Sequence, residues 1–151
     1  MNNNLLLTQA KELIELSGNN KYSEITVLAN ISSLIFYNFD NINWAGFYYI
    51  EDDKFILGPF QGKVACTNIP TNKGMLGKCL KKNETLVIKD VHQEKEHIAC
   101  DNASNSELII PLKKNDKIIL MLDIDSYEFD NFKIEDIKLL EQISKLIENI
   151  I

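Results

Sequence analysis

The sequence has 151 residues, 45% of them hydrophobic and 25% charged, a composition typical of one soluble globular domain and unlike that of a disordered or fibrous chain. A formal net charge of -6 at pH 7 disfavours nucleic acid as a partner, because phosphate backbones attract clustered cations. All 16 cationic side chains are lysines, which excludes bidentate guanidinium recognition of a carboxylate or phosphate. We expect a single domain spanning residues 1–151.

The N-terminal segment, residues 1–17, lacks both the basic region and the unbroken apolar run of a secretory signal. No other run is apolar enough to span a bilayer, so the sequence predicts a cytoplasmic protein with no membrane partner. Three cysteines are an odd number, and in a reducing compartment they indicate buried thiols or redox chemistry better than structural disulfides.

Two helices are predicted at the start of the chain. Residues 5–16 carry leucines at helical spacing and are followed by Gly18. Ser23 is the expected N-cap of a second helix, which has apolar residues at steps of three and four and ends near Asp40.

The next segments are rich in aromatic and β-branched residues. Residues 43–50 and 55–57 predict a hairpin, and the Gly- and Pro-containing segment 58–62 predicts a break. A third short strand is expected at 64–69, and it carries Cys66.

The second half of the chain alternates between the same element types. The predicted elements are helical turns at 74–82, a strand at 85–88, a long ordered loop at 89–105, strands at 106–112 and 118–124, and an amphipathic helix at 134–151. Helices gathered at the ends of an antiparallel sheet give the α+β class.

Acidic and aromatic side chains are paired on predicted strands. Alternation places Asp123 and Asp125 on one face, where the like charges favour a cationic ligand group or a retained proton. A solvated strand end would carry the same acids. Trp44 and Tyr48 also share a face, as a ligand-binding wall or as ordinary core, while Phe47 and Tyr49 point the opposite way.

Six ordered motifs resemble those of the free methionine-(R)-sulfoxide reductases: Asn-Trp-Ala-Gly-Phe-Tyr at 43–48, Gly-Pro-Phe-Gln-Gly-Lys-Val-Ala-Cys at 58–66, Asp-Val-His at 90–92, His-Ile-Ala-Cys-Asp at 97–101, Ser-Asn-Ser-Glu at 104–107 and Leu-Asp-Ile-Asp-Ser at 122–126. The resemblance implies a GAF domain. In that fold a central antiparallel sheet has N- and C-terminal helices on one face and a loop-covered ligand pocket on the other.

The resemblance also implies an activity and a set of site residues. The implied reaction reduces free methionine sulfoxide to methionine, with no bound cofactor and with thioredoxin, and indirectly NADPH, as the reductant. By position in the motifs, Cys100 would be the nucleophile and Cys66 the resolving cysteine. The substrate pocket would contain Trp44, Tyr48, Glu107, Asp123 and Asp125.

Sulfoxide reduction requires a thiolate that attacks sulfur and an acid that protonates the departing oxygen. The attacking cysteine becomes a sulfenic acid, and a second thiol condenses with it to a disulfide that an external dithiol reduces. An imidazolium at His97 or nearby loop amides would lower the pKa of the Cys100 thiol, and Asp101 would raise it. Which of these effects prevails stays open at the level of sequence.

One motif departs from the family pattern. Many members have a further cysteine in a Gly-Val-Cys-Gly segment, and this chain has Leu76 at that place, within Gly-Met-Leu-Gly. A cycle with two cysteines is therefore expected. Cys79 lies one helical turn further on, and we interpret it as a packing residue.

Other functions are compatible with parts of the sequence. A zinc site built from His92, His97, Cys66 and Cys100 lacks a second compact ligand pair, so no metal is predicted. A non-catalytic GAF sensor of small ligands is the main rival, although no output domain follows the last predicted helix. A homodimer through the terminal helices is also compatible with the sequence, but a purely structural module would leave the acids and cysteines unexplained.

Overall fold

The structure is a computed structural model that describes residues 2–98, 100 and 103–151. Within these residues, six antiparallel strands form one sheet in the order β3-β2-β1-β6-β5-β4. The strands are β1 (Ile42–Glu51), β2 (Lys54–Gly62), β3 (Asn68–Pro70), β4 (Leu86–Ile88), β5 (Ser106–Lys114) and β6 (Lys117–Ser126). The helices are α1 (Asn3–Leu16), α2 (Ser23–Asn38), α3 (Gly74–Lys82) and α4 (Ile134–Glu148).

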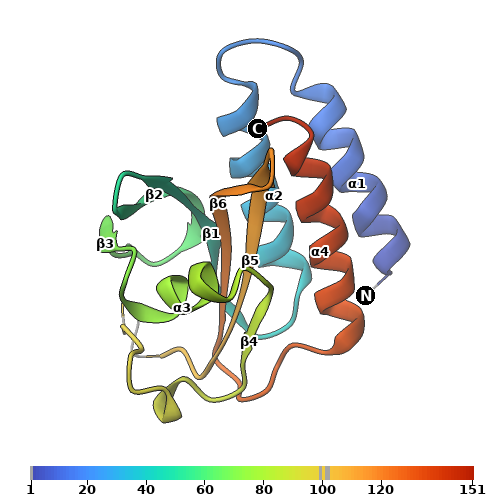
Figure 1. The fold of residues 1–151 in the computed structure, drawn as a ribbon. Coiled ribbons are helices and arrows are strands. Elements are labelled where there is room, and N and C mark those ends of the chain that lie inside the picture. Colours follow the sequence, from blue (N-terminus) through green and yellow to red (C-terminus); the bar gives the residue numbers. More distant parts are fainter. Residues whose placement is uncertain (1, 99, 101–102) are drawn as a thin grey trace.

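The helices are divided unequally between the two faces of the sheet (Figure 1). Helices α2 and α4 pack on one face, and α1 lies against both of them. Helix α3 and the connecting segments lie on the other face, beside β5 and β6. The predicted α+β class, with the terminal helices on one side of an antiparallel sheet, is confirmed.

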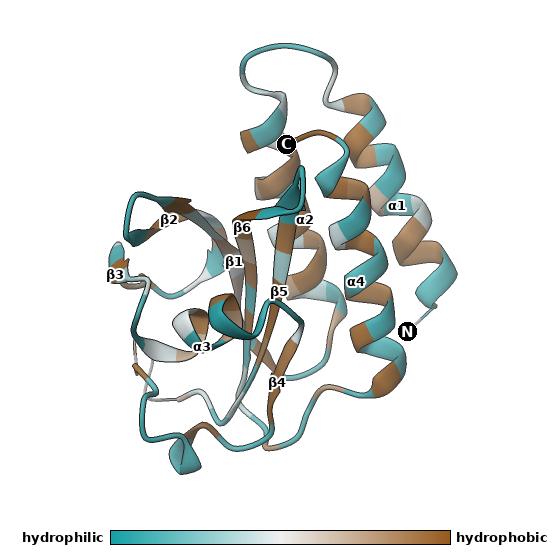
Figure 2. Ribbon diagram, viewed as in Figure 1, coloured by the Kyte–Doolittle hydropathy of each residue, from teal (hydrophilic) through white to brown (hydrophobic). Residues whose placement is uncertain are grey.

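Each face of the sheet has its own apolar cluster, because successive side chains of a strand point to opposite sides. Phe47 is buried in the cluster under the three long helices, and Tyr49 packs against it. Trp44 and Tyr48 are buried in the second cluster, on the side of the sheet where α3 lies. Figure 2 accordingly shows hydrophobic residues along the central strands as well as on the helices. The opposite orientations expected for these two aromatic pairs are therefore confirmed.

The predicted break at 58–62 is wrong, because β2 continues to Gly62. The register between β1 and β2 shifts here: Gly46 pairs with Phe60, whereas Tyr48 pairs with Leu57. Pro59 falls within this irregularity, and β3 pairs only with residues 54–56 of β2. A proline that lacks a ladder N–H is tolerated at such a bulge on a free strand edge.

The strand predicted at 64–69 is also wrong in its extent. Only Asn68–Pro70 pairs with β2, so Cys66 lies in the connection that precedes β3. The β-branched residue Val64 has no partner strand beside it within the described residues, and a residue with high strand propensity forms a strand only where such a partner is present.

The remaining differences concern the ends of elements. The N-cap of α2 is Tyr22, while Ser23 is already helical and its Oγ accepts a hydrogen bond of 2.8 Å from the backbone N–H of Asn20. The expected loop at 89–105 includes one 3-10 turn, Val91–Gln93. No helix among the described residues is long and apolar enough to cross a membrane.

Candidate active site

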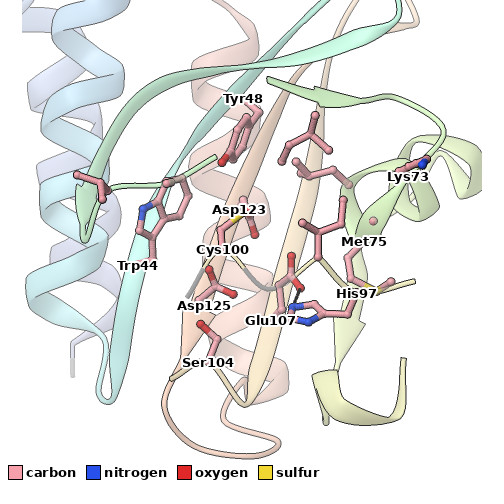
Figure 3. Close-up of a pocket in the computed structure, with 16 residues that line it drawn as sticks. Trp44, Tyr48, Lys73, Met75, His97, Cys100, Ser104, Glu107, Asp123 and Asp125 are labelled. Carbon is pink, nitrogen blue, oxygen red and sulfur yellow. Dashed lines mark ion pairs between the residues drawn. The ribbon is translucent and has the colours of Figure 1, made fainter. Parts of the chain in front are cut away.

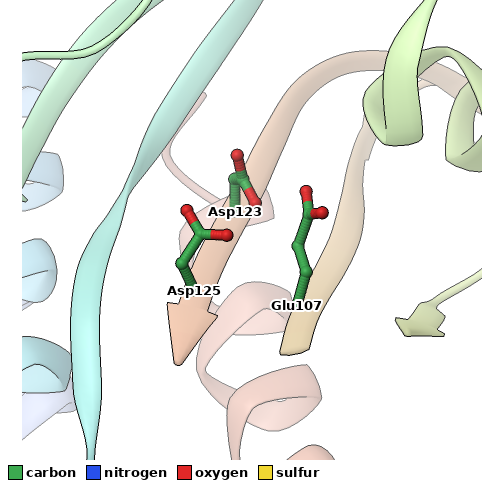
Figure 4. Close-up of side chains that lie close together, drawn as sticks. All are labelled: Glu107, Asp123 and Asp125. Atoms are coloured by element: carbon green, nitrogen blue, oxygen red, sulfur yellow. The ribbon is translucent and has the colours of Figure 1, made fainter. Parts of the chain in front are cut away.

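Three carboxyl groups meet on the α3 side of the sheet (Figure 4). Glu107 on β5 pairs directly with Asp125 on β6, and Asp123 stands two residues earlier on the same face of β6. One carboxylate oxygen from each of the three lies within 4.8 Å of the others. The shared face predicted for Asp123 and Asp125 is thus present, and strand pairing adds Glu107 to it.

Burial makes this group of acids electrostatically costly. Glu107 is 6% and Asp123 8% exposed, and Glu107 Oε2 and Asp123 Oδ1 make no hydrogen bond within the described part of the chain. Burial raises the pKa of Glu107 well above its usual value, and the neighbouring charges of Asp123 and Asp125 raise it further. Burial also raises the pKa of Asp123, to about 7, although a hydrogen bond to Glu107 acts in the opposite direction and lowers it. The Glu107–Asp123 pair therefore retains a proton at neutral pH.

An aromatic wall stands beside the acids on β1. The rings of Trp44 and Tyr48 stack at 5.8 Å between centroids, and Trp44 also stacks on Phe60 of β2 at 5.3 Å. Gly46 lies between them on the same face, where a Cβ atom would come within 2.7 Å of Trp44 Cη2. The missing side chain lets the indole lie flat and leaves room in front of Asp123, which pairs with Gly46 across the strands.

The two cysteines predicted to be catalytic from the motifs are linked by a disulfide bond. Cys66 and Cys100 form a disulfide, although 34 positions separate them in sequence, and their Cα atoms are 5.9 Å apart. Cys66 is half-buried and Cys100 is exposed, so an external thiol can reach the bond. The structure thus represents the oxidised state of this pair.

The acids, the aromatic wall and Cys100 line one pocket, which is partly open to solvent and has a cavity volume of about 50 Å³ (Figure 3). All the predicted site residues line the pocket except Cys66, which is bonded to Cys100. The pocket is also lined by residues that were not predicted from the sequence: Val64, Ala65, Ile69, Lys73, Gly74, Met75, Leu76, His97, Ile98 and Ser104.

His97 contacts an acid of the pocket, as the dashed line in Figure 3 indicates. Its Nε2 lies 3.7 Å from Glu107 Oε2. Burial lowers the pKa of His97, and the nearby His92 lowers it further. The raised pKa of Glu107 favours its protonated, neutral form. We therefore describe a contact between two neutral groups at pH 7 and not a salt bridge. An imidazolium that activates Cys100 is disfavoured for the same reason, and Asp101 lies outside the described residues.

Cys79 is separate from this chemistry. It is fully buried, its Sγ donates to the carbonyl oxygens of Glu84 and Ile109 at 3.2 and 3.8 Å, and burial raises its pKa to about 12. Leu76, one turn earlier on α3, lines the pocket where a family cysteine was expected. These positions agree with a packing role for Cys79.

The residues considered for a zinc site have other partners. Cys66 and Cys100 are bonded to each other, His97 contacts Glu107, and His92 Nε2 lies 2.7 Å from Asn105 Oδ1. Within the described residues, the side chains placed to coordinate a metal ion are those of the acid trio, whose oxygen atoms suit hard cations. The proton retained by Glu107 and Asp123 competes with such an ion.

Comparisons with known proteins identify the family. The GAF domain model matches residues 27–151. The chain is 46% identical over 129 residues to the free methionine-R-sulfoxide reductase of Escherichia coli K12, covering 85% of this chain and 78% of that protein. This chain is a member of the free methionine-R-sulfoxide reductase family.

Solved structures of family members match over nearly the whole chain. The reduced form of fRMsr of Staphylococcus aureus has a TM-score of 0.90 and 47% identity, covering 98% of this chain and 94% of that chain. The free methionine-R-sulfoxide reductase of Neisseria meningitidis, solved in complex with its substrate, has a TM-score of 0.89 and 31% identity, covering 97% and 86%. The GAF fold is confirmed, and family membership favours a reductase over a non-catalytic sensor.

Proposed function

We propose that this chain reduces free methionine-(R)-sulfoxide to methionine, with Cys100 as nucleophile, Cys66 as resolving cysteine and thioredoxin as the external reductant. The observation that carries the proposal is the Cys66–Cys100 disulfide beside a pocket lined with buried carboxyls and stacked aromatic rings. Similarity to the E. coli and N. meningitidis reductases supports the choice of substrate.

The pocket matches the parts of a free amino acid. The acid trio, of which Glu107 and Asp123 are buried, faces the α-ammonium group, whose positive charge offsets the cost of grouping carboxylates. The ring faces of Trp44 and Tyr48 pack against the methyl and thioether carbons. The substrate is thereby held with its sulfur near Cys100.

The reaction divides into two steps. The Cys100 thiolate attacks the sulfoxide sulfur, and the proton retained by the Glu107–Asp123 pair is donated to the sulfoxide oxygen. The protonated oxygen is then transferred from the substrate sulfur to the Cys100 sulfur as the bond between the two sulfurs breaks, so methionine leaves with the electron pair and Cys100 becomes a sulfenic acid. The Cys66 thiol then displaces this oxygen as water and forms the disulfide, which a dithiol reductant reduces by thiol–disulfide exchange.

Single-turnover chemistry tests this function. Reduced protein mixed with excess free methionine-(R)-sulfoxide and no reductant is expected to form one methionine per chain and then stop. Peptide mass mapping is expected to find Cys66 linked to Cys100, and thioredoxin with its reductase and NADPH is expected to restore turnover. A wild-type protein that forms no methionine, or a disulfide that contains Cys79, would contradict the scheme.

Peptide-bound methionine sulfoxide is expected to be a poor substrate. A peptide nitrogen carries no charge, so the buried acids would lose the partner that compensates them. We expect kcat/KM for N-acetylmethionine-(R)-sulfoxide to be lower than for the free amino acid by about a hundredfold or more. Chromatographic measurement of the two reduced products gives this ratio, and equal values would refute the enclosure of the ammonium.

A further inference from the structure

Trp44 and Tyr48 each direct one polar atom toward the backbone that leads to Cys66. The indole Nε1–H of Trp44 donates to the carbonyl oxygen of Lys63 at 3.1 Å. The hydroxyl of Tyr48 donates to the carbonyl oxygen of Cys66 itself at 3.0 Å. Both side chains are almost completely buried, at 4% and 2% exposed, so neither bond is exchanged easily for one to water.

The backbone that receives these bonds belongs to no strand. Residues 63–66 follow the end of β2 at Gly62 and precede β3, so no strand ladder fixes their position. Gly62 has a φ of 126°, and a Cβ there would lie 2.7 Å from both Asn43 O and Trp44 Cδ1. The chain therefore turns closely over the indole ring, and hydrogen bonds from the two aromatic side chains on β1 then fix its position.

The position of Cys66 matters because bond formation needs close approach of two backbones. Disulfides form when the Cα atoms are about 4.4 to 6.8 Å apart, and the Cys66 and Cys100 Cα atoms are 5.9 Å apart. A shift of the 63–66 segment by a few ångströms would take Cys66 out of this range. The carbonyl bonded by Tyr48 lies on the residue that must be held.

We propose that the Tyr48 hydroxyl, assisted by the Trp44 indole N–H, is a positioning group for resolution: it holds the backbone of Cys66 where its thiol can condense with the sulfenic acid of Cys100. This inference rests on the proposed function. In the step concerned, the Cys66 sulfur displaces the oxygen from Cys100, the oxygen leaves as water with the thiol proton, and an S–S bond forms. Tyr48 exchanges no atom or electron in it.

The test measures how the sulfenic acid is partitioned. Tyr48→Phe keeps the ring and removes the hydroxyl. After one turnover with methionine-(R)-sulfoxide, a fixed concentration of a cyclic 1,3-dione competes with Cys66 for the sulfenic acid, and mass spectrometry counts the Cys100 adduct and the disulfide. We expect the adduct-to-disulfide ratio to rise about three- to tenfold in Tyr48→Phe, the factor that one hydrogen bond corresponds to. Because both products arise from the same sulfenic acid, the ratio does not depend on how fast that acid is formed.

Tyr49→Phe is the matched control. It removes the same atom from the neighbouring tyrosine, which packs on the opposite face of the sheet, and is expected to leave the ratio at the wild-type value. An unchanged ratio in Tyr48→Phe, or an equal rise in Tyr49→Phe, would overturn the proposal.

The experiment also separates this inference from the proposed function. Hydrogen peroxide oxidises a Cys100 thiolate to the same sulfenic acid without any sulfoxide, and the ratio is then measured again. A wild type that releases no methionine but shows the Tyr48-dependent ratio after peroxide would contradict the proposed function alone. Normal methionine release, together with the same adduct-to-disulfide ratio in the wild type and in Tyr48→Phe, would contradict the positioning role alone.

Discussion

Cys100→Ser is expected to abolish reduction of free methionine-(R)-sulfoxide, with a loss in kcat/KM of about a thousandfold or more. A serine hydroxyl is a far weaker nucleophile than a thiolate, and it has no sulfenic acid state in which to hold the oxygen. NADPH oxidation coupled through thioredoxin and its reductase measures the loss. Activity that survives this substitution would remove Cys100 from the role of nucleophile.

Cys66→Ser should separate the two steps. The first methionine still forms, because the nucleophile and the acid pair are intact, but thioredoxin-dependent turnover is expected to stop with Cys100 as a sulfenic acid. Cys79→Ser is the matched control, because it removes a buried thiol that hydrogen-bonds to backbone carbonyl oxygens and is not among the residues that line the pocket. It is expected to retain both steps. Continued thioredoxin-dependent turnover in Cys66→Ser would contradict the role of Cys66 as the resolving thiol.

The local parts of this site could be predicted from sequence because a strand fixes which residues share a face. Residue parity alone put Trp44 with Tyr48 and Asp123 with Asp125, and the structure has both pairs. The approach of Glu107 depends instead on the register between β5 and β6. Parity within one strand contains no information on that register, so only the resemblance to a family placed Glu107 in the pocket.

The connections were predicted less well than the strands, for a related reason. Val64 and Thr67 are β-branched residues with strand propensity, but the chain leaves β2 at Gly62 and pairs with it again only at Asn68. Whether such a segment becomes a strand depends on a partner edge and on long-range bonds such as Tyr48 to the Cys66 carbonyl. The contact between His97 and Glu107 likewise joins a loop to a distant strand.

Asp123→Asn is expected to stabilise the protein in the absence of substrate while it impairs catalysis. The pKa of Asp123 is about 7 in the folded state against 3.8 for the ordinary group. Between these two values the folded protein keeps a proton that the unfolded chain loses, so the wild-type free energy of unfolding falls as the pH rises. An asparagine remains neutral throughout and avoids this loss.

The expected gain in unfolding free energy at pH 8 is about 2 to 4 kcal/mol. It follows from the rise of the Asp123 pKa from 3.8 to about 7, and it is reduced because Asp123 shares its proton with Glu107. It should shrink as the pH is lowered toward 4, where the wild-type carboxyl is protonated in both states. Urea unfolding of substrate-free protein across this range measures it. Asp53→Asn makes the same chemical change at an exposed turn and is expected to alter the unfolding free energy by less than about 0.5 kcal/mol.

In the proposed mechanism, Asp123 shares the catalytic proton and faces the substrate ammonium, and the same substitution removes this carboxyl group. We expect kcat/KM for free methionine-(R)-sulfoxide to fall by about a hundred- to a thousandfold, as is usual when a general acid is lost. If this one substitution makes the protein more stable and less active, the buried carboxyl at position 123 is electrostatically unfavourable without ligand and is needed for activity. If Asp123→Asn were instead destabilised at pH 8, or equally active, the buried acids would be ordinary structural groups, and the electrostatic account of the pocket would fail.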